Sequence, residues 1–256
     1  MGQGTATAVV TGVGRRRGIG AAICQALLRD RWAVSACGWR PYDVEAPWFD
    51  SAADDVDTLV REFEASGRFH WQSLDLTPPE AGGGLFEELD GANSPAAALV
   101  LAHAMSLSGG LLEVTADDFD RHMQVNARST LLLIQQFARR CDQAGIPGAI
   151  VTFVSHPPLS GEIAYAASKG AIEWLTLSAA AGLAPGITVN AIDPGPTDTG
   201  WMGPDVHARI AEASPLRRPT RSEDVADVVA FLCSERGHGI TGQVIHCDGG
   251  WSSLRG

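Results

Sequence analysis

The hydrophobic positions of this chain form short, unbroken apolar runs that alternate with longer stretches of helical period. The runs predicted to be strands lie near Ala6–Thr11, Trp32–Gly38, Phe69–Leu74, Ala97–Ala102, Ala149–Ser155, Thr188–Ile192 and Gln243–His246. Strands that show no polar alternation are buried on both faces, and helical segments between them supply the cover. The pattern therefore predicts an α/β fold: a Rossmann-type, doubly wound parallel sheet of about seven strands with helices on both faces.

The 256 residues fit one large α/β domain or two small domains. No internal repeat, low-complexity tract or linker is evident, so we expect a single nucleotide-binding domain over residues 1–256. The acidic and aromatic stretch Pro41–Asp55 is predicted to be a surface excursion after the second strand. In such sheets ligands bind beyond the carboxyl ends of the strands, so the informative loops follow the strands.

Composition narrows the possible partners and the compartment. A formal net charge of −11 argues against nucleic acids and anionic membranes as general partners. No apolar run approaches a membrane span of roughly 20 residues, and no secretory signal precedes the first strand, so we expect a cytoplasmic protein. The five cysteines form no C-x-x-C pair, so neither a disulfide framework nor a metal site is predicted.

A glycine-rich turn, T-G-V-G-R-R-R-G-I-G, joins the first strand to a helix. Gly12, Gly18 and Gly20 let the backbone turn tightly beside a helix N-terminus, which is an arrangement typical of pyrophosphate binding. The arginine triplet 15–17 is either a solvated loop or a clamp on phosphate.

The end of the second strand bears on the choice between the two dinucleotides. An NAD enzyme usually places an acid there against the ribose 2′-hydroxyl, but C-G-W-R has no carboxylate until Asp43. This absence, together with Arg40 and the triplet, favours NADP(H) over NAD(H). Asp75, after the third strand, is placed either to contact the adenine or to cap the following helix.

The only lysine of the chain, Lys169, follows Tyr165 by four residues in Y-A-A-S-K. Residues i and i+4 share a helix face, so the ammonium can approach the phenol and lower its pKa. A tyrosine poised in this way suits proton transfer during carbonyl reduction or alcohol oxidation. The alternative is that Tyr165 and Lys169 form a partly exposed pair on the helix without a function.

Taken together, these motifs resemble the short-chain dehydrogenase/reductase family, in particular its 3-oxoacyl-carrier-protein reductase-like members, over nearly the whole chain. The matching pieces are T-G-x5-G-I-G, Asp75, V-N at 125–126, Ser155, Y-A-A-S-K, I-D-P-G-P-T-D-T and I-T-G-Q-V-I-H-C-D-G-G. The resemblance implies a homo-oligomer, a tetramer or a dimer. The helices at Leu131–Phe137 and Ala166–Leu183 are either its interface or core.

The resemblance also implies a catalytic set. Tyr165 is then the general acid, and Lys169 lowers its pKa and holds the nicotinamide ribose. Ser155 orients the substrate carbonyl, and Asn126 anchors a water that links Lys169 to solvent. The implied cofactor contacts are Gly12, Arg15, Arg17, Gly18, Ile19, Gly20, Arg40, Asp75, Leu76, Ala102, Tyr165, Lys169, Pro194, Gly195, Thr197 and Thr199. A substrate lid is expected around residues 194–215.

Three departures from the family pattern stand out. Ser155 precedes Tyr165 by ten residues where about thirteen is usual, and Thr152 has the usual spacing but falls inside a strand. His103 stands in A-H-A-M where the family has N-N-A-G, and we expect it to brace the sheet rather than transfer protons. The long glycine loop is similar to that of enoyl reductases, which place six residues rather than three between tyrosine and lysine.

The sequence thus predicts an NAD(P)(H)-dependent oxidoreductase that interconverts a carbonyl and an alcohol, with an NADPH-dependent ketone or 3-oxoacyl reductase favoured. The alternative is a non-catalytic, NADP(H)-binding or sensing subunit of the same fold. A halohydrin dehalogenase-like activity is disfavoured, because those relatives replace the lysine and lose the glycine loop. The substrate, a small molecule, stays open.

Overall fold

The structure is a computed structural model that describes residues 6–45, 50, 55–91, 95–156 and 159–254. Its main sheet has seven strands in the order β3-β2-β1-β4-β5-β6-β9, and every neighbouring pair is parallel. The strands are β1 (Thr7–Thr11), β2 (Ala33–Gly38), β3 (Phe69–Ser73), β4 (Ala96–Leu101), β5 (Gly148–Phe153), β6 (Ile187–Asp193) and β9 (Val244–His246). The predicted fold class is confirmed, with strand ends within two residues of those expected.

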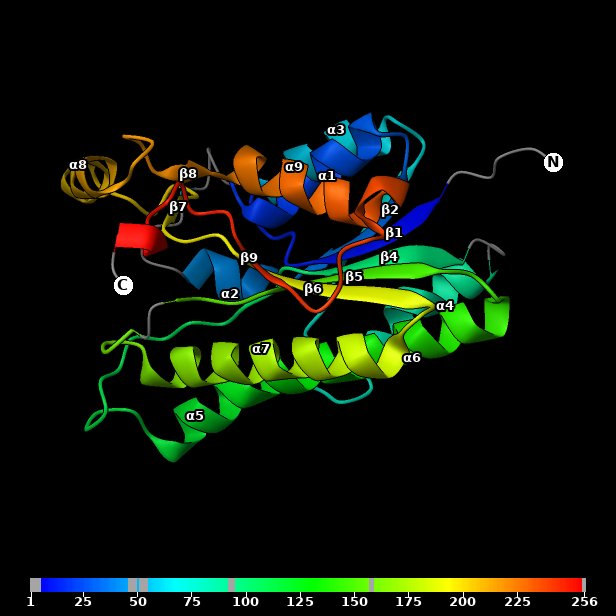
Figure 1. Cartoon of the computed structure of the whole chain (residues 1–256), viewed down its shortest axis with the longest axis horizontal. Helices are drawn as coiled ribbons and strands as arrows, with labels where there is room; N and C mark the ends of the chain where they lie inside the picture. The colour runs from blue at the N-terminus through cyan, green and yellow to red at the C-terminus, as the bar shows by residue number, and fades with distance from the viewer. Residues whose placement is uncertain (1–5, 46–49, 51–54, 92–94, 157–158, 255–256) are drawn as a thin grey trace.

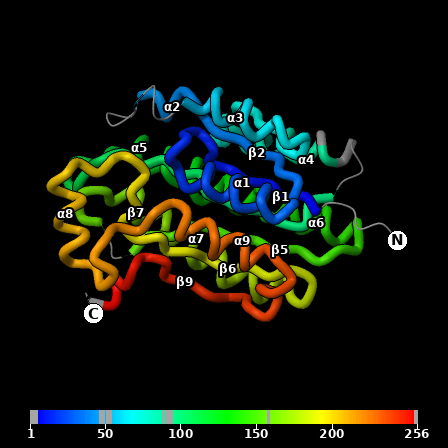
Figure 2. Tube along the Cα trace, turned by 90° about the horizontal axis from the view of Figure 1, so that it is seen from above, coloured from blue at the N-terminus to red at the C-terminus, as the bar shows by residue number. Residues whose placement is uncertain are grey.

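Helices cover both faces of the sheet and make three layers (Figure 1). On one face lie α1 (Ile19–Arg29) and α9 (Ser222–Cys233), which pack against each other; the view from above shows them side by side over the strands (Figure 2). The other face carries α4 (Gly82–Gly91), α6 (Ser129–Ala144) and α7 (Ile163–Leu183). The short helix α3 (Val56–Glu64) packs beside the edge strand β3.

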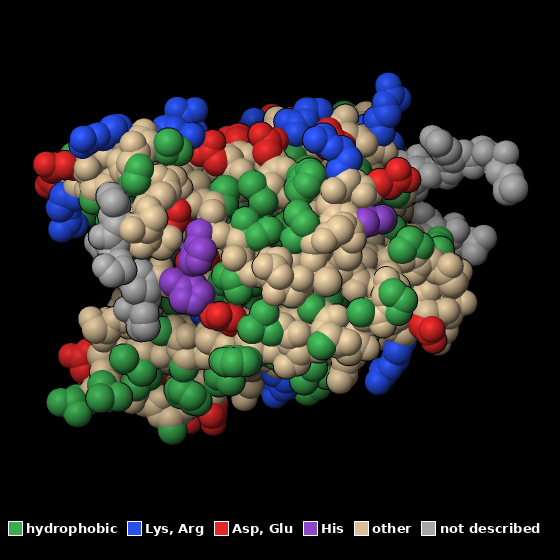
Figure 3. Space-filling model, in the orientation of Figure 1, with side chains coloured by type: hydrophobic (Ala, Val, Ile, Leu, Met, Phe, Trp, Pro, Cys, Tyr) green, Lys and Arg blue, Asp and Glu red, His purple; other side chains and the backbone are tan. Residues whose placement is uncertain are grey.

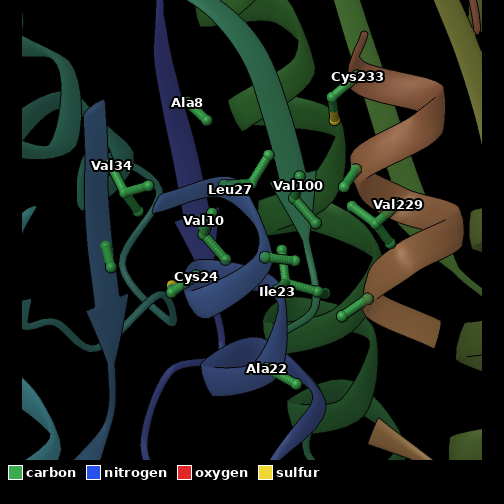
Figure 4. Packing of buried hydrophobic residues seen from close by; sticks show 14 of the residues in the cluster. Ala8, Val10, Ala22, Ile23, Cys24, Leu27, Val34, Val100, Val229 and Cys233 are labelled. Carbon is green, nitrogen blue, oxygen red and sulfur yellow. The ribbon is translucent and has the colours of Figure 1, made fainter. Parts of the chain in front are cut away.

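Apolar side chains fill the space between the sheet and its helices on both faces. Under α1 and α9, Val10 and Val100 from neighbouring strands meet Ile23 and Leu27 of α1 and Val229 of α9 (Figure 4). A second cluster lies under the opposite helices and includes Leu99, Leu133 and Phe137. The unalternating apolar strands are thus explained by burial on both sides.

The helices α6 and α7 each bury one side and expose another. Leu133 and Phe137 of α6 are buried, whereas Trp174 of α7 is 72% exposed. The buried sides agree with the core interpretation of these helices, and the interface interpretation stays a prediction. None of the helices in the described ranges combines the length and hydropathy that a bilayer crossing requires.

The described part of the segment 41–55 holds no buried residue, in keeping with the predicted surface excursion. Its first part belongs to a short helix, α2 (Arg40–Glu45), in which Tyr42 hydrogen-bonds the backbone of Ser106 beyond β4. Tyr42 is only half-buried, yet its hydroxyl both donates to and accepts from that backbone. Residues 46–49 and 51–54 lie outside the described ranges.

The predicted lid region contains elements that the sequence pattern did not reveal. They are β7 (Thr197–Asp198) and α8 (Pro204–Ala213), and β7 pairs with β8 (Thr220–Arg221), which follows the lid region. These elements lie at the end of the molecule opposite the N-terminus (Figure 1). Trp201 is anchored by its indole N–H, which donates to the Thr197 carbonyl at 2.8 Å.

The start of β5 gives a test of this packing. A Cβ at Gly148 would lie 2.8 Å from Cε1 of the fully buried Phe137 ring, so we expect Gly148→Ala to destabilise the fold by about 1–3 kcal/mol. Gly182→Ala is the matched control, because a Cβ there meets open space and Ala favours a helix by up to ~1 kcal/mol. Urea unfolding followed by circular dichroism measures both; equal midpoints would contradict the packing described.

Candidate functional site

A cavity of about 490 Å³ opens beyond the carboxyl ends of the strands, where the order reverses between β1 and β4. Most of the predicted cofactor contacts line it: Gly12, Arg15, Gly18, Ile19, Gly20, Asp75, Leu76, Ala102, Tyr165, Lys169, Pro194 and Thr199. Arg17, Arg40, Gly195 and Thr197 are not among its lining residues. The glycine turn and the tyrosine–lysine pair, 145 residues apart between Gly20 and Tyr165, thus face one cleft.

The glycine turn is held against the end of β4 by backbone contacts. Gly12 has φ +78°, and a Cβ there would lie 2.5 Å from the carbonyl carbon of Ala102. A Cβ at Gly20 would lie 2.5 Å from the carbonyl oxygen of Gly12. Both contacts involve backbone atoms, which cannot move aside as a flexible side chain can. Glycine at these positions is therefore a geometric requirement of the turn.

The start of α1 is suited to an anion. Gly18 is its N-cap and brings no side chain, and the first turn holds no acidic residue. The exposed N–H groups and the positive end of the helix dipole therefore face the cleft without a competing carboxylate. These features, together with the glycine contacts, fit the pyrophosphate of a dinucleotide.

Arg15 and Arg40, both predicted cofactor contacts, have different surroundings. Arg15 reaches across the mouth of the cleft to donate to Thr199, at 3.2 Å to its carbonyl oxygen and 3.4 Å to its Oγ1. It also lies 3.6 Å from a carboxylate oxygen of Asp43, a residue that lines the cleft. Arg40 instead pairs with Asp57 at 2.6 Å on the exposed side of α2. The structure brings Arg15, but not Arg40, to the site.

The other two arginines of the triplet point away from this cleft. Arg16 pairs with Glu62 of α3 at 2.9 Å. The Arg17 guanidinium packs on Gly200, where a Cβ would lie 2.3 Å from its Cζ. Of the triplet, only Arg15 lines the cavity, so the predicted clamp of three arginines is reduced to one.

Asp75 lines the cleft and also stabilises a turn. Its Oδ1 accepts from the Thr77 backbone N–H at 2.8 Å, which is a local turn contact. The next helix, α4, begins only at Gly82, so Asp75 does not cap that helix as the alternative prediction had it.

Tyr165 and Lys169 lie on the first turns of α7, with the lysine Nζ 5.5 Å from the tyrosine ring centroid. Lys169 is 3% exposed and donates to the Phe153 carbonyl at 3.0 Å, and burial lowers its pKa to about 8. Burial, with the acidic Glu162 nearby, raises the pKa of Tyr165 above its ordinary value. The net shift is upward because desolvation dominates, and the lowering of that pKa by Lys169 stays a prediction. The phenol therefore holds its proton at neutral pH.

Asn126 is fully buried within a π-helical turn, Met123–Arg128, that leads into α6. Its Oδ1 accepts from the Met105 N–H at 2.7 Å, and its Nδ2 donates to the Met105 carbonyl and to Ser168 Oγ, both at 2.9 Å. The side chain thus ties the loop after β4 to α7. Because these contacts occupy the amide, its observed role is to join these elements, and the predicted water contact is untested.

The two candidates for the family serine lie in different surroundings. Thr152 is fully buried in β5, and its Oγ1 lies 2.7 Å from Thr176 Oγ1 of α7. Its hydroxyl therefore faces the core rather than the cleft. Ser155 is half-buried two residues beyond β5 and is absent from the lining residues of the cavity. Ser155 thus lies at the edge of the sheet where the strands end and the cleft opens. It makes no hydrogen bond to Tyr165 in this structure.

His103 joins three elements through a directed chain of hydrogen bonds. Ser129 donates its hydroxyl proton to the Val125 carbonyl, so its oxygen accepts from His103 Nε2 at 2.7 Å. The other ring nitrogen, Nδ1, then accepts from Thr11 Oγ1 at 2.6 Å. Burial, helped by the charge of Lys169, lowers the pKa of His103 to about 3. A neutral histidine therefore links the end of β1 to α6, which is the bracing arrangement predicted.

Sequence reasoning missed the contribution of α2 and the loop after β4 to this cleft. Tyr42 donates to the Ser106 carbonyl at 3.2 Å and accepts from its N–H at 2.9 Å. Ser106 Oγ in turn donates to Glu162 Oε2 at 2.5 Å, just before α7. Tyr42 lies in the aromatic stretch after β2, but nothing in the spacing of that stretch points to residue 106.

The chain is similar in sequence and structure to known proteins that include oxidoreductases. A family model described as enoyl-(acyl carrier protein) reductase matches residues 12–252. The chain is 34% identical to an uncharacterised oxidoreductase, YjdA, of Bacillus subtilis (strain 168), over 95% of this chain and 96% of that protein. It is 32% identical to L-xylulose reductase of Bos taurus, covering 95% of each. A blue fluorescent protein from a metagenomic library, crystallised with NADPH, superposes with a TM-score of 0.80 at 31% identity, covering 96% of this chain and 98% of that one.

The buried histidine predicts how stability depends on pH. An unfolded histidine titrates near its ordinary pKa of 6.5, whereas folded His103 titrates near 3, so the unfolded chain binds the extra proton first. The contribution of His103 to stability is complete above pH ~6.5 and is lost as the pH falls toward 3, by up to about 1.4 kcal/mol per pH unit. His103→Asn should flatten this slope between pH 6.5 and 4.5, as measured by urea unfolding at each pH. An unchanged slope would contradict the neutral, buried state.

Proposed function

The chain belongs to the short-chain dehydrogenase/reductase family of NAD(P)-dependent oxidoreductases, and from this premise we propose that it reduces a ketone to an alcohol with NADPH. The observation that carries the proposal is one cleft lined at one end by Gly12 and Gly20 and at the other by Tyr165 and Lys169. The first pair suits the phosphates of a dinucleotide, and the second suits proton transfer to oxygen.

In the proposed mechanism the protein supplies alignment and protons, whereas a bound nicotinamide supplies the hydride. Tyr165 donates its phenolic proton to the carbonyl oxygen as negative charge develops there. The raised pKa of Tyr165 keeps that proton in place at neutral pH until the oxygen becomes basic enough to take it. In the direction of alcohol oxidation the same oxygen accepts the proton.

Lys169 is proposed to stabilise the phenolate that remains and to return a proton to it. A lysine whose pKa is about 8 is mostly an ammonium at pH 7, yet can release a proton at modest cost. Its contact with the Phe153 carbonyl fixes Nζ at the end of β5. Burial strengthens its electrostatic effect on the neighbouring phenol, because fewer waters screen the charge.

Ser155 is proposed to hydrogen-bond the substrate carbonyl, and Asn126 to hold the cleft wall in place. Support for Ser155 comes from its position beyond β5 and from the burial of its rival, Thr152. Support for Asn126 is its set of three contacts, which join the loop at Met105 to the helix bearing the tyrosine.

NADPH is proposed over NADH on the strength of Arg15. It lines the cleft near the end of β2, where Gly38 and Trp39 offer no carboxylate to a ribose hydroxyl. Asp43 opposes this preference, but its carboxylate faces Arg15 at 3.6 Å, which offsets part of its charge. NADPH is also the cofactor named for the metagenomic structural relative.

The proposed substrate is a small ketone or a 3-oxoacyl compound. The bovine relative is named for reduction of a ketose, which supports the first class. Although the matching family model is described by an enoyl activity, the three residues between Tyr165 and Lys169 follow the carbonyl-reductase spacing. A non-catalytic, NADP(H)-binding subunit is the alternative, and it predicts binding without turnover over a panel of ketones.

The chain has two tyrosines, which allows a matched test of the acid. We expect Tyr165→Phe to lower kcat by at least ~10²-fold, because it removes the donated proton without changing shape. Tyr42→Phe removes a hydroxyl that contacts the Ser106 backbone, so its main effect should be on KM. NADPH consumption over a ketone panel measures both; undiminished turnover in Tyr165→Phe would refute the assignment.

The cofactor preference is tested by comparing two arginines. We expect Arg15→Leu to lower the ratio of kcat/KM for NADPH to that for NADH by ~10–100-fold, which corresponds to one charge-assisted contact. Arg40→Leu should leave that ratio within about twofold, because its guanidinium pairs with Asp57 outside the cleft. A larger effect of Arg40→Leu than of Arg15→Leu would identify Arg40 as the phosphate contact. A preference of the wild type for NADH would refute a phosphate contact by either arginine.

A further inference from the structure

Two histidines and an aspartate meet beyond the ends of three neighbouring strands, β5, β6 and β9. Asp193 Oδ2 lies 3.2 Å from His156 Nδ1 and 3.1 Å from His246 Nδ1. The three potential ligand atoms all lie within 4.8 Å of one another. Figure 3 shows histidine side chains next to each other and beside acidic side chains on one face of the molecule. None of the three residues lines the proposed active-site cavity.

Asp193 is the buried member of this cluster. It is 1% exposed, and its Oδ1 accepts from the Gly195 backbone N–H at 3.1 Å, which fixes the orientation of the carboxylate. Its other oxygen, Oδ2, consequently points at both imidazoles. A buried carboxylate oriented in this way requires positive charge or donors opposite it.

His156 faces more acceptors than one neutral imidazole can serve. His156 has a carboxylate oxygen at each ring nitrogen, from Asp193 at Nδ1 and from Glu173 at Nε2, the latter at 2.9 Å. A neutral imidazole carries one N–H and can satisfy only one of these acceptors. The second acceptor is satisfied either by a further proton or by a metal ion bound at Nδ1. In the metal-bound arrangement Nε2–H donates to Glu173, as metal-bound histidines commonly do to a carboxylate.

The spacing of the ligand atoms is compatible with a bound metal ion. Zn²⁺ binds imidazole nitrogen and carboxylate oxygen at about 2.0–2.1 Å, so the ligand atoms of a tetrahedral site lie about 3.3–3.4 Å apart. The two aspartate–histidine separations, 3.1 and 3.2 Å, are close to that value. The two imidazole nitrogens would need to approach to the same separation. Both side chains are partly exposed, at 35% and 44%, which leaves room for this adjustment.

We propose that His156, Asp193 and His246 bind one divalent transition-metal ion, Zn²⁺ being the ion that best fits the set. Two imidazoles and one carboxylate match the preference of zinc, whereas Mg²⁺ and Ca²⁺ favour all-oxygen sites. Glu173 orients His156 from outside the coordination sphere, and solvent completes the fourth position on the exposed side. The ion would connect the ends of the three strands, next to Ser155 and to the turn at Pro194.

Zinc binding tests the proposal independently of any enzymatic activity. Untagged, chelator-treated full-length protein is titrated with Zn²⁺ in a calorimeter, and one equivalent is expected to bind. Glu173→Gln should weaken that affinity by ~10–100-fold, as for other outer partners of metal ligands, and His156→Ala or His246→Ala should weaken it further. His238→Ala is the matched control, since His238 is exposed on a different part of the chain and should bind zinc as the wild type does.

A second readout guards against loss of fold in the variants. Zn²⁺ should raise the Tm of the wild type and of His238→Ala, but not that of His156→Ala or His246→Ala. Circular dichroism without zinc should be the same for all four proteins, because both cluster histidines are partly exposed. Failure of the wild type to bind zinc would overturn the proposal. Binding that survives His156→Ala and His246→Ala would also overturn it, by placing the ion elsewhere.

Discussion

The close approach of the glycine turn to the end of β4 is the constraint on which the rest of the site depends. At Gly12 and Gly20 the backbone leaves no room for a Cβ, and the atoms that would block it belong to backbone. This contact places the start of α1 directly over the point where the strand order reverses. It also brings β1 beside the loop of His103, so that the hydrogen bonds from Thr11 through His103 to Ser129 can form. The proposed phosphate-binding turn and the bracing of the sheet thus share one geometric origin.

Burial determines the protonation states in the cleft. Desolvation lowers the pKa of Lys169 and of His103 and raises that of Tyr165, so each group is moved toward its neutral form. His103 is moved so far that it stays neutral and acts as a hydrogen-bonding brace. Lys169 is moved less and remains mostly charged at pH 7, close to a phenol that keeps its proton. A charged donor and a protonated acid can therefore be adjacent without forming an ion pair.

The sequence predicted those features that depend on local pattern. Unbroken apolar runs identified the strands of the sheet because burial on both faces removes polar alternation. The glycine turn and Y-A-A-S-K were recognisable because their spacing is short. Contacts between distant segments were not predictable in this way: Tyr42 meets Ser106 across 64 residues, and Arg40 is drawn to Asp57 rather than to the cleft. The cluster of His156, Asp193 and His246 likewise joins segments 37 and 53 residues apart.

The same cluster bears on the short spacing between Ser155 and Tyr165. A chain with three fewer residues than usual between strand and helix has less freedom to direct the serine toward the cleft. Here the residue after Ser155 is His156, which is anchored to Asp193 of β6 and to Glu173 of α7. These two anchors fix the backbone at the start of the loop from both the sheet side and the helix side. Ser155 thus precedes a residue that is held to both β6 and α7, which limits the freedom of the shortened loop at its start.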